Sequence, residues 1–352
     1  MTSPLNPTEL KIRYANYKLE NPKKRIRDAA KDLAVSELEL LSLSVGEHVT
    51  RLRPEPKALL SEIEALGEVM ALTRNEFVVH ERKGVYSNLS FMDGHNMGLV
   101  VNPDIDLRLF MGQWKSIYAV VLETRGRKLY GFQFFNARGE AVHKIYLTPK
   151  SIQAIYLQLV EKYKADDQSI GTTVDKSVVE PKEYAKDEEV DILAFHKEWI
   201  QMEDTHHFFG MLGKHQLARQ QALRLAPKGY AYQVDNDAIK RVMHQAAKEE
   251  VPIMVFVHSR GCIQIHTGKV KKIVELGDWF NIMDPMFNLH LNTRGVDQTW
   301  VVFKNTKEGL VTSIELFDEQ GELIVYCFGK RKPGIPELAS WRKLVHTLAP
   351  NN

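Results

Sequence analysis

IDLRLF (105–110) and FQFFNARGEAVHKIYL (132–147) have counterparts later in the chain, FNLHLN (287–292) and SIELFDEQGELIVYCF (313–328). Equivalent residues are 182 positions apart, as in the pairs Arg108 and His290, Phe135 and Phe317, and Gly139 and Gly321. A separation that holds over so long a stretch, with no net insertion, indicates an internal duplication. We therefore expect the chain to fold as two similar halves.

A polar stretch divides these halves. Residues 163–191 hold few apolar side chains and many charges, which is typical of a linker or a solvated surface loop. We expect an N-terminal repeat over residues 1–170, a linker over 171–187 and a C-terminal repeat over 188–352.

The order of elements is the same in both halves. Apolar residues at helical spacing predict helices over 26–43 and 56–66 in the first half, and over 205–216, 218–226 and 236–249 in the second. Alternating runs that follow predict strands, joined by hairpins at the glycine-containing turns. The predicted fold class is α+β, a tandem repeat in which each half packs its helices on a large antiparallel β-sheet.

Composition limits the class of protein. The 352 residues include 47 Lys and Arg and 45 Asp and Glu, a formal net charge of +2, which argues against a protein devoted mainly to nucleic acid. No apolar run approaches the roughly 18 residues of a membrane helix, and the N-terminus lacks the apolar core of a signal peptide. We therefore expect a cytoplasmic protein without membrane insertion.

Several common site motifs are missing. Cys262 and Cys327 lie far apart and form no CxxC, so ordinary buried thiols are favoured over a zinc or redox site. There is also no GxGxxG, GxxxxGK[ST], HExxH or GxSxG motif, so phosphate cradles, zincin sites and hydrolase elbows lack support.

The first candidate ligand-binding residue is His206, in DTHHFF (204–209). Asp204 or Thr205 is suited to cap a helix, which would place His206 in the first turn. There the helix dipole disfavours the imidazolium form, and a neutral imidazole is the form that binds a metal.

The neighbours of His206 are apolar, and they suit a cavity for a large flat ligand with one metal-binding point: Phe208, Phe209, Met211 and Leu212. Alternatively, His206 and His207 are surface or capping histidines, because His–His pairs are common and unspecific.

The second candidate is Arg108. On a strand, Asp106, Arg108 and Phe110 share one face, while Leu107 and Leu109 point to the other. Arg108 would then lie in a cleft and donate hydrogen bonds to a bound anion or water. Alternatively, the strand has one solvated face.

Arg219 and Lys304 are a third pair of candidates, in a predicted helix and at the end of a predicted strand. Each alone is typical of a solvated surface cation. Together they suit a ligand with two carboxylates.

Residues 23–46 resemble a helix-turn-helix and carry a basic cluster at their start, which makes DNA binding a rival interpretation. The second helix, SELELLSL (36–43), counts against it, because it is acidic and offers no Arg, Lys, Asn or Gln to read bases.

Longer runs resemble the HemS-type haemin-transport and haemin-degrading proteins of Gram-negative bacteria over nearly the whole chain, at collinear spacing. These runs are LGEVMALTRNEFVVHERKGVYSNL (66–89), GLVVNPDIDLRLFMGQW (98–114), WIQMEDTHHFFGMLGKHQLARQQALRLA (199–226), IMVFVHSRGCIQIHTG (253–268) and LGDWFNIMDPMFNLHL (276–291).

The resemblance implies haem in a cleft of the C-terminal half, as ligand or substrate. It assigns the proximal iron ligand to His206 and the distal arginine to Arg108, with Phe110 beside it. The propionate-binding cations fall on Arg219 and Lys304.

Three features qualify this assignment. At an offset of 182, His206 corresponds to Lys24 and Arg219 to Glu37, so we expect one haem per chain. Tyr326 and Phe328 stand where relatives carry Gln and Tyr, so a hydroxyl contact to haem is lost at Phe328, and Tyr326 offers one instead. His207 is an alternative iron ligand.

The function that the resemblance implies is haem-iron acquisition. The chain would take haem from an inner-membrane importer and pass it to an acceptor, or open the macrocycle with electrons from a donor protein. Arg108 would hold a water or oxygen over the iron in an enzyme. A haem-responsive DNA-binding regulator is the alternative.

Overall fold

A computed structural model describes residues 6–92, 94–124, 126–178, 182–332 and 334–351. Contacts divide the chain into two compact units. The first comprises residues up to 73, 81–178 and 259–264, and the second comprises 74–80, 182–258 and 265–351. The units differ from contiguous halves by two short exchanged segments, and the linker bounds of 171 and 187 stay a prediction.

The first unit packs helices on both faces of a sheet. Its helices are α1 (Pro7–Glu20), α2 (Ile26–Asp32), α3 (Glu37–Ser42), α4 (Pro56–Glu62) and α5 (Gln153–Tyr163), with the 3-10 turns η1 (Ile63–Leu66) and η2 (Met111–Gln113). The sheet order is β1 (Val49–Leu52), β7 (Ser116–Thr124), β8 (Arg127–Phe135), β9 (Ala141–Leu147), β2 (Val69–Arg74), with antiparallel neighbours. A second set of antiparallel strands comprises β4 (Leu89–Phe91), β5 (Met97–Val101) and β6 (Asp106–Phe110).

The second unit repeats this plan. Its helices are α6 (Ile192–Ile200), α7 (His207–Lys214), α8 (Arg219–Arg224), α9 (Ala238–Lys248) and α10 (Ala339–Val345), with η3 (Asp187–Glu189) and η4 (Thr293–Gly295). The sheet order is β10 (Ala231–Val234), β16 (Gln298–Thr306), β17 (Gly309–Phe317), β18 (Leu323–Gly329), β11 (Ile253–His258). The smaller set is β13 (Ile273–Leu276), β14 (Trp279–Met283) and β15 (Phe287–Asn292). β3 (Val78–Gly84) and β12 (Cys262–Gly268) are divided between the units, and Arg74 at the end of β2 also belongs to the second unit.

The duplication and the α+β class are confirmed by the matching of elements. β1, β7 and β8 coincide with β10, β16 and β17 at an offset of 182, and α3 coincides with α8. Both sheets have a register shift at equivalent points, between Phe134 and Phe135 and between Leu316 and Phe317. The turn glycines Gly139 and Gly321 both have φ of 76°, the left-handed conformation that glycine adopts without strain.

The helix-turn-helix form predicted for residues 23–46 is confirmed, since α2 and α3 are separate helices and Ala34 adopts a φ of 55° between them, as Gln216 does (53°) between α7 and α8. α1, α5, α6 and α10 had not been predicted. α1 buries only Leu10, so its sequence lacks the apolar stripe from which a helix is recognised.

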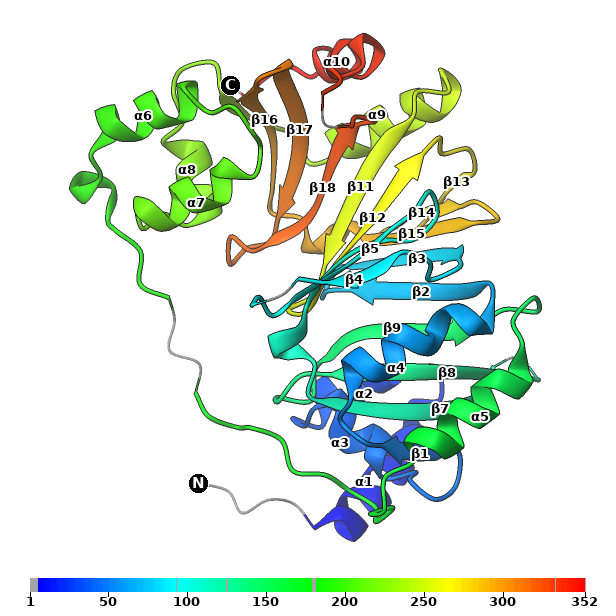
Figure 1. The fold of residues 1–352 in the computed structure, drawn as a ribbon. Helices are drawn as coiled ribbons and strands as arrows, with labels where there is room; N and C mark the ends of the chain where they lie inside the picture. Colours follow the sequence, from blue (N-terminus) through cyan, green and yellow to red (C-terminus); the bar gives the residue numbers. More distant parts are fainter. Residues whose placement is uncertain (1–5, 93, 125, 179–181, 333, 352) are drawn as a thin grey trace. The chain divides into compact units, whose positions relative to one another are not determined.

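Side chains of the second unit's sheet alternate between two layers. Val255, Val325 and Cys327 face a core shared with α9 and α10. Trp300, Val302 and Phe317 face a core shared with α6, α7 and α8. Figure 1 shows these two groups of helices on opposite faces of β16–β18.

The helix-turn-helix segment is packed into the first unit. Leu38, Leu40, Leu41 and Ser42 of α3 are buried, and buried Glu37 forms an ion pair with Lys144. A helix buried in this way offers no face to a DNA groove, so the structure argues against the DNA-binding alternative.

None of the helices in the described ranges has the length and apolar character needed to cross a lipid bilayer.

Candidate functional site

His206 immediately precedes the first turn of α7. Its side chain is 89% exposed, and it stands at the N-cap rather than inside the helix, one position earlier than expected. The Oδ1 atom of Asp204 accepts hydrogen bonds from the backbone N–H of His206 at 2.8 Å and from its Nδ1 at 2.6 Å. These hydrogen bonds, the backbone bond foremost, hold the pKa of Asp204 below its ordinary value. With Nδ1–H directed to the carboxylate, the Nε2 lone pair of His206 is available to a metal.

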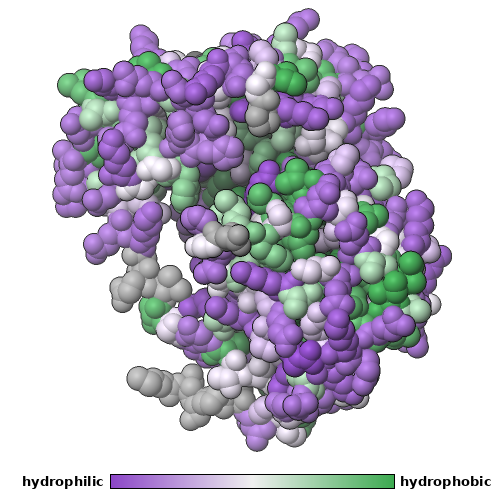
Figure 2. Space-filling view, viewed as in Figure 1, coloured by the Kyte–Doolittle hydropathy of each residue, from purple (hydrophilic) through white to green (hydrophobic). Residues whose placement is uncertain are grey.

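The residues that follow His206 point in different directions. His207 is exposed, and Phe209 is 80% exposed. Phe208, Met211 and Leu212 are buried in the core beneath α7. Phe209 therefore lies on another side of α7 from Phe208, because successive residues of a helix are about 100° apart. The apolar cavity wall stays a prediction. The outer surface of α6–α8 is mostly hydrophilic (Figure 2).

Three aromatic side chains, Phe256, Tyr326 and Phe328, form what we call the aromatic shelf. The Phe256 and Tyr326 rings stack at 4.7 Å between centroids, and Phe328 packs edge-on against both, at 5.3 and 5.6 Å. They come from β11 and β18, where Phe256 is directly opposite Tyr326. Phe256 and Tyr326 are only partly buried. The shelf is suited to stack against a flat apolar ligand.

A charged cluster adjoins this shelf. Arg219 donates from Nε and Nη2 to the two carboxylate oxygens of Glu315, at 2.7 and 2.9 Å. Lys304 Nζ and Ser313 Oγ donate to Glu315 Oε1, at 2.7 and 2.9 Å. The Arg219 guanidinium lies 5.3 Å from the ring centroids of both Phe208 and Tyr326. The cluster thus joins α8 to the aromatic shelf.

Burial differs among the three charges. The Glu315 side chain is 0% exposed, Lys304 3% and Arg219 24%. Burial lowers the pKa of Lys304 to about 8, although Glu315 opposes this shift. Burial raises the pKa of Glu315, but Arg219 and Lys304 outweigh it and hold the pKa well below its ordinary value. Lys304 is therefore not the solvated cation considered from sequence, and Arg219 is the more accessible of the two cations.

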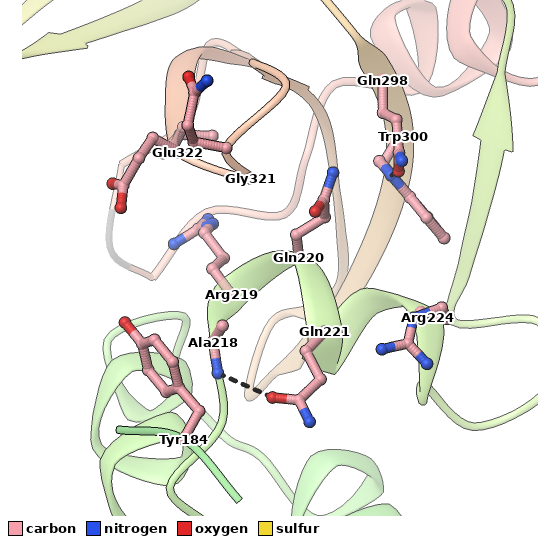
Figure 3. Close-up of a pocket in the computed structure, with 12 residues that line it drawn as sticks. Tyr184, Ala218, Arg219, Gln220, Gln221, Arg224, Gln298, Trp300, Gly321 and Glu322 are labelled. Atoms are coloured by element: carbon pink, nitrogen blue, oxygen red, sulfur yellow. Dashed lines mark hydrogen bonds between the residues drawn. The ribbon is translucent and has the colours of Figure 1, made fainter. Parts of the chain in front are cut away.

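A polar cavity of about 320 Å³ lies beside α8, and Arg219 is part of its wall. Figure 3 shows Arg219 and Gln220 projecting from α8 toward the turn that contains Gly321 and Glu322. At the start of α8, the Ala218 N–H donates to Gln221 Oε1 at 3.2 Å. Arg219 therefore borders both this cavity and the aromatic shelf.

Arg108 and Phe110 belong to the first unit. Leu107 and Leu109 are fully buried while Asp106, Arg108 and Phe110 are partly exposed, as the alternation predicted. Arg108 Nη1 donates to Asp106 on the same face of the strand and to the Leu107 carbonyl at 3.2 Å. The roles predicted for these residues toward a ligand stay predictions.

Sequence reasoning had missed Phe256 and Glu315 and the bond from His206 Nδ1 to Asp204. Glu315 left a signal, since it is the one charge in the otherwise uncharged strand GLVTSIELF (309–317). Phe256 left no such signal, because aromatic residues are common in strands that pack against a core.

The equivalent place in the first unit has a different charge pattern. Arg219 corresponds to Glu37, Glu315 to Gln133 and Tyr326 to Lys144. There the buried Glu37–Lys144 pair is formally neutral. The two units therefore differ in charge at this place, and one haem per chain stays a prediction.

The chain is similar to one protein family and to several known proteins. The family model described as the haemin-degrading HemS.ChuX domain matches residues 34–163 and 216–348, once in each half. The hemin transport protein HemS of Yersinia enterocolitica is 39% identical over 94% of each chain. Holo-PhuS, a heme-binding protein from Pseudomonas aeruginosa, is 44% identical, with a TM-score of 0.94 over 99% of this chain and 100% of that one. The heme degrading enzyme ChuS of Escherichia coli O157:H7 is 34% identical, with a TM-score of 0.88 over 98% and 100%.

Proposed function

Since the chain belongs to the haemin-degrading HemS.ChuX family, we propose that it binds haem and acts in the acquisition of haem iron. His206 would bind the iron through Nε2. The observation that carries this assignment is the hydrogen bond from His206 Nδ1 to Asp204, which matches the carboxylate–histidine arrangement common at metal-bound histidines.

We expect residues of the second unit to bind different parts of the haem molecule. An exposed imidazole suits the iron, the aromatic shelf suits the porphyrin face, and Arg219 suits a propionate. Burial of the macrocycle supplies most of the affinity of such a site. Haem contributes a redox-active iron when bound, and the protein's part is to hold it and control access to it.

Both a carrier and an enzyme fit this site. Hemin transport describes one relative and heme degradation another, so the family contains both activities. In the enzyme, Arg108 would donate hydrogen bonds at the haem, which would supply the redox-active iron. In the carrier, the Arg108 guanidinium would interact with the bound haem only weakly, so that haem can be released.

Product analysis separates these two functions. The protein is loaded with haemin and supplied with a reductant, with catalase present to remove free peroxide. Linear tetrapyrrole that still forms supports the enzyme. Haem that stays intact, or decays only when catalase is omitted, supports the carrier.

The partners follow from either function. We propose a cytoplasmic location, an inner-membrane importer as the source of haem and an acceptor protein for haem or iron. An enzyme would also need an electron donor. Co-purification of haem-loaded protein from cells with and without the importer tests the first of these links.

A further inference from the structure

The Arg219–Glu315–Lys304 cluster contains more than a haem-binding site needs. Glu315 accepts four hydrogen bonds, two of them from Arg219 and one each from Lys304 and Ser313. A carboxylate in the same cluster competes for both cations with any carboxylate that arrives from outside. The two cations and Glu315 together leave one formal positive charge.

The Nη1 atom of the Arg219 guanidinium shows where an external carboxylate would bind. Nε and Nη2 donate to Glu315, whereas Nη1 makes no hydrogen bond to the described residues. Lys304 is 3% exposed, and its Nζ lies 4.5 Å from the centroid of the Phe208 ring. A ligand carboxylate therefore reaches Nη1 of Arg219 first, beside a negative charge that weakens the attraction.

The first unit shows that the fold does not require a charged side chain at the position of Glu315. Its equivalent position holds the two-member pair of Glu37 and Lys144, with Gln133 in the place of Glu315. Gln133 is buried and donates to Tyr146 at 2.9 Å. A neutral amide is thus accommodated at this point of the same β-sheet.

We propose that Glu315 is a specificity-determining residue that lowers the affinity of the site for propionate carboxylates and so keeps haem exchangeable. The proposal rests on the haem-binding function inferred above. A haem molecule carries two propionates, and Glu315 limits the positive charge that meets them to one unit. The residue acts as a fixed internal counter-ion of Arg219 and Lys304.

The test compares haemin with its dimethyl ester, in which both propionates are neutral, with each ligand delivered from the same detergent micelles. Glu315→Gln keeps the shape and is made in the Lys304→Met background, because Glu315 raises the pKa of the buried Lys304 and its loss would neutralise that lysine. In this background the substitution raises the cluster charge from zero to plus one. We expect haemin to bind about tenfold more tightly to the double variant than to Lys304→Met, and the ester to bind equally to both. Transfer of haem to apomyoglobin slows by a similar factor.

A double variant, Glu315→Gln with Lys304→Met, restores the original net charge and removes the buried cation that lost its partner. We expect its preference for haemin over the ester to be close to that of the unaltered protein. The comparison that isolates Glu315 is the one between the double variant and Lys304→Met. Glu319→Gln, an exposed charge in the same unit, is the control for net charge.

Three outcomes would overturn the proposal. Haemin affinity that is unchanged or falls from Lys304→Met to the double variant shows that Glu315 orients Arg219 rather than weakening the site. If the double variant binds haemin no more tightly than the dimethyl ester, Glu315 likewise has an orienting role and does not weaken the site. Equal binding of both ligands by the unaltered protein excludes propionate recognition, whereas failure to bind haemin at all contradicts the proposed function itself.

Discussion

The Nδ1 atom of His206 lies 2.6 Å from the Oδ1 atom of Asp204, two residues earlier in the chain, and the same oxygen accepts the backbone N–H of His206. One carboxylate therefore fixes both the backbone and the ring of a side chain that is otherwise 89% exposed. This bond also selects the nitrogen available to the iron.

Asp204→Asn should weaken haem binding. The amide can still accept the backbone N–H, but it lacks the charge that makes the imidazole a stronger ligand, so we expect about a tenfold loss of haemin affinity. Haemin titration followed by visible absorption measures it. The control is Glu203→Gln, which removes the neighbouring exposed carboxylate. Equal affinities for the two variants would exclude a role for the Asp204 bond.

Phe256→Ala should remove one side of the aromatic shelf. We expect haemin affinity to fall on the order of tenfold, since the stacked Phe256–Tyr326 pair is broken. Phe303→Ala is the matched control, because Phe303 lies in the core on the α9–α10 side of the sheet. That variant should lose stability, about 3 kcal/mol or more, and keep its affinity. The idea of a shelf fails if both variants bind haemin like the unaltered protein.

Arg108→Ala tests the predicted distal role. In an enzyme we expect at least a tenfold slower formation of linear tetrapyrrole at saturating haemin, because the proposed donor to the iron-bound group is lost. Arg127→Ala, in an exposed position on β8, is the control. An unchanged rate of linear tetrapyrrole formation in Arg108→Ala would show that Arg108 has no part in the reaction.

His143 makes the first unit sensitive to acid. It is buried between Thr73 and Tyr86, and burial lowers its pKa to about 3 from 6.5. The unfolded chain therefore binds one more proton between these values, so stability is complete above pH 6.5 and falls as the pH drops toward 3.

Chemical denaturation at pH 7 and pH 5 checks this. His143→Gln, which cannot take up the proton, should show a pH dependence smaller by about 1.4 kcal/mol per pH unit below pH 6.5. The same slope in both proteins would mean that His143 is not the group that titrates.

The repeat and the main strands could be predicted because an unbroken offset of 182 and strand alternation are local sequence properties. Asp106, Arg108 and Phe110 do share a face. The charged cluster could not be predicted, since Arg219, Lys304 and Glu315 come together only through the pairing of β16 with β17 and the packing of α8. Lys304 gave a misleading signal, because a lysine at the end of a strand is usually solvated.

The position of His206 was predicted to within one residue of the helix start. Its orientation was not, because Asp204 was expected to cap the helix and instead holds the ring. The exposure of Phe209 was not predicted, because the sequence does not show which side of α7 faces the core.

The most direct test of the central claim is a haemin titration of the unaltered protein, His206→Ala and His207→Ala, followed by visible absorption. We predict saturation at one haem per chain with a histidine-ligated spectrum for the unaltered protein and for His207→Ala, and loss of that spectrum in His206→Ala. An unchanged spectrum in His206→Ala would contradict the assignment of His206 as the iron ligand.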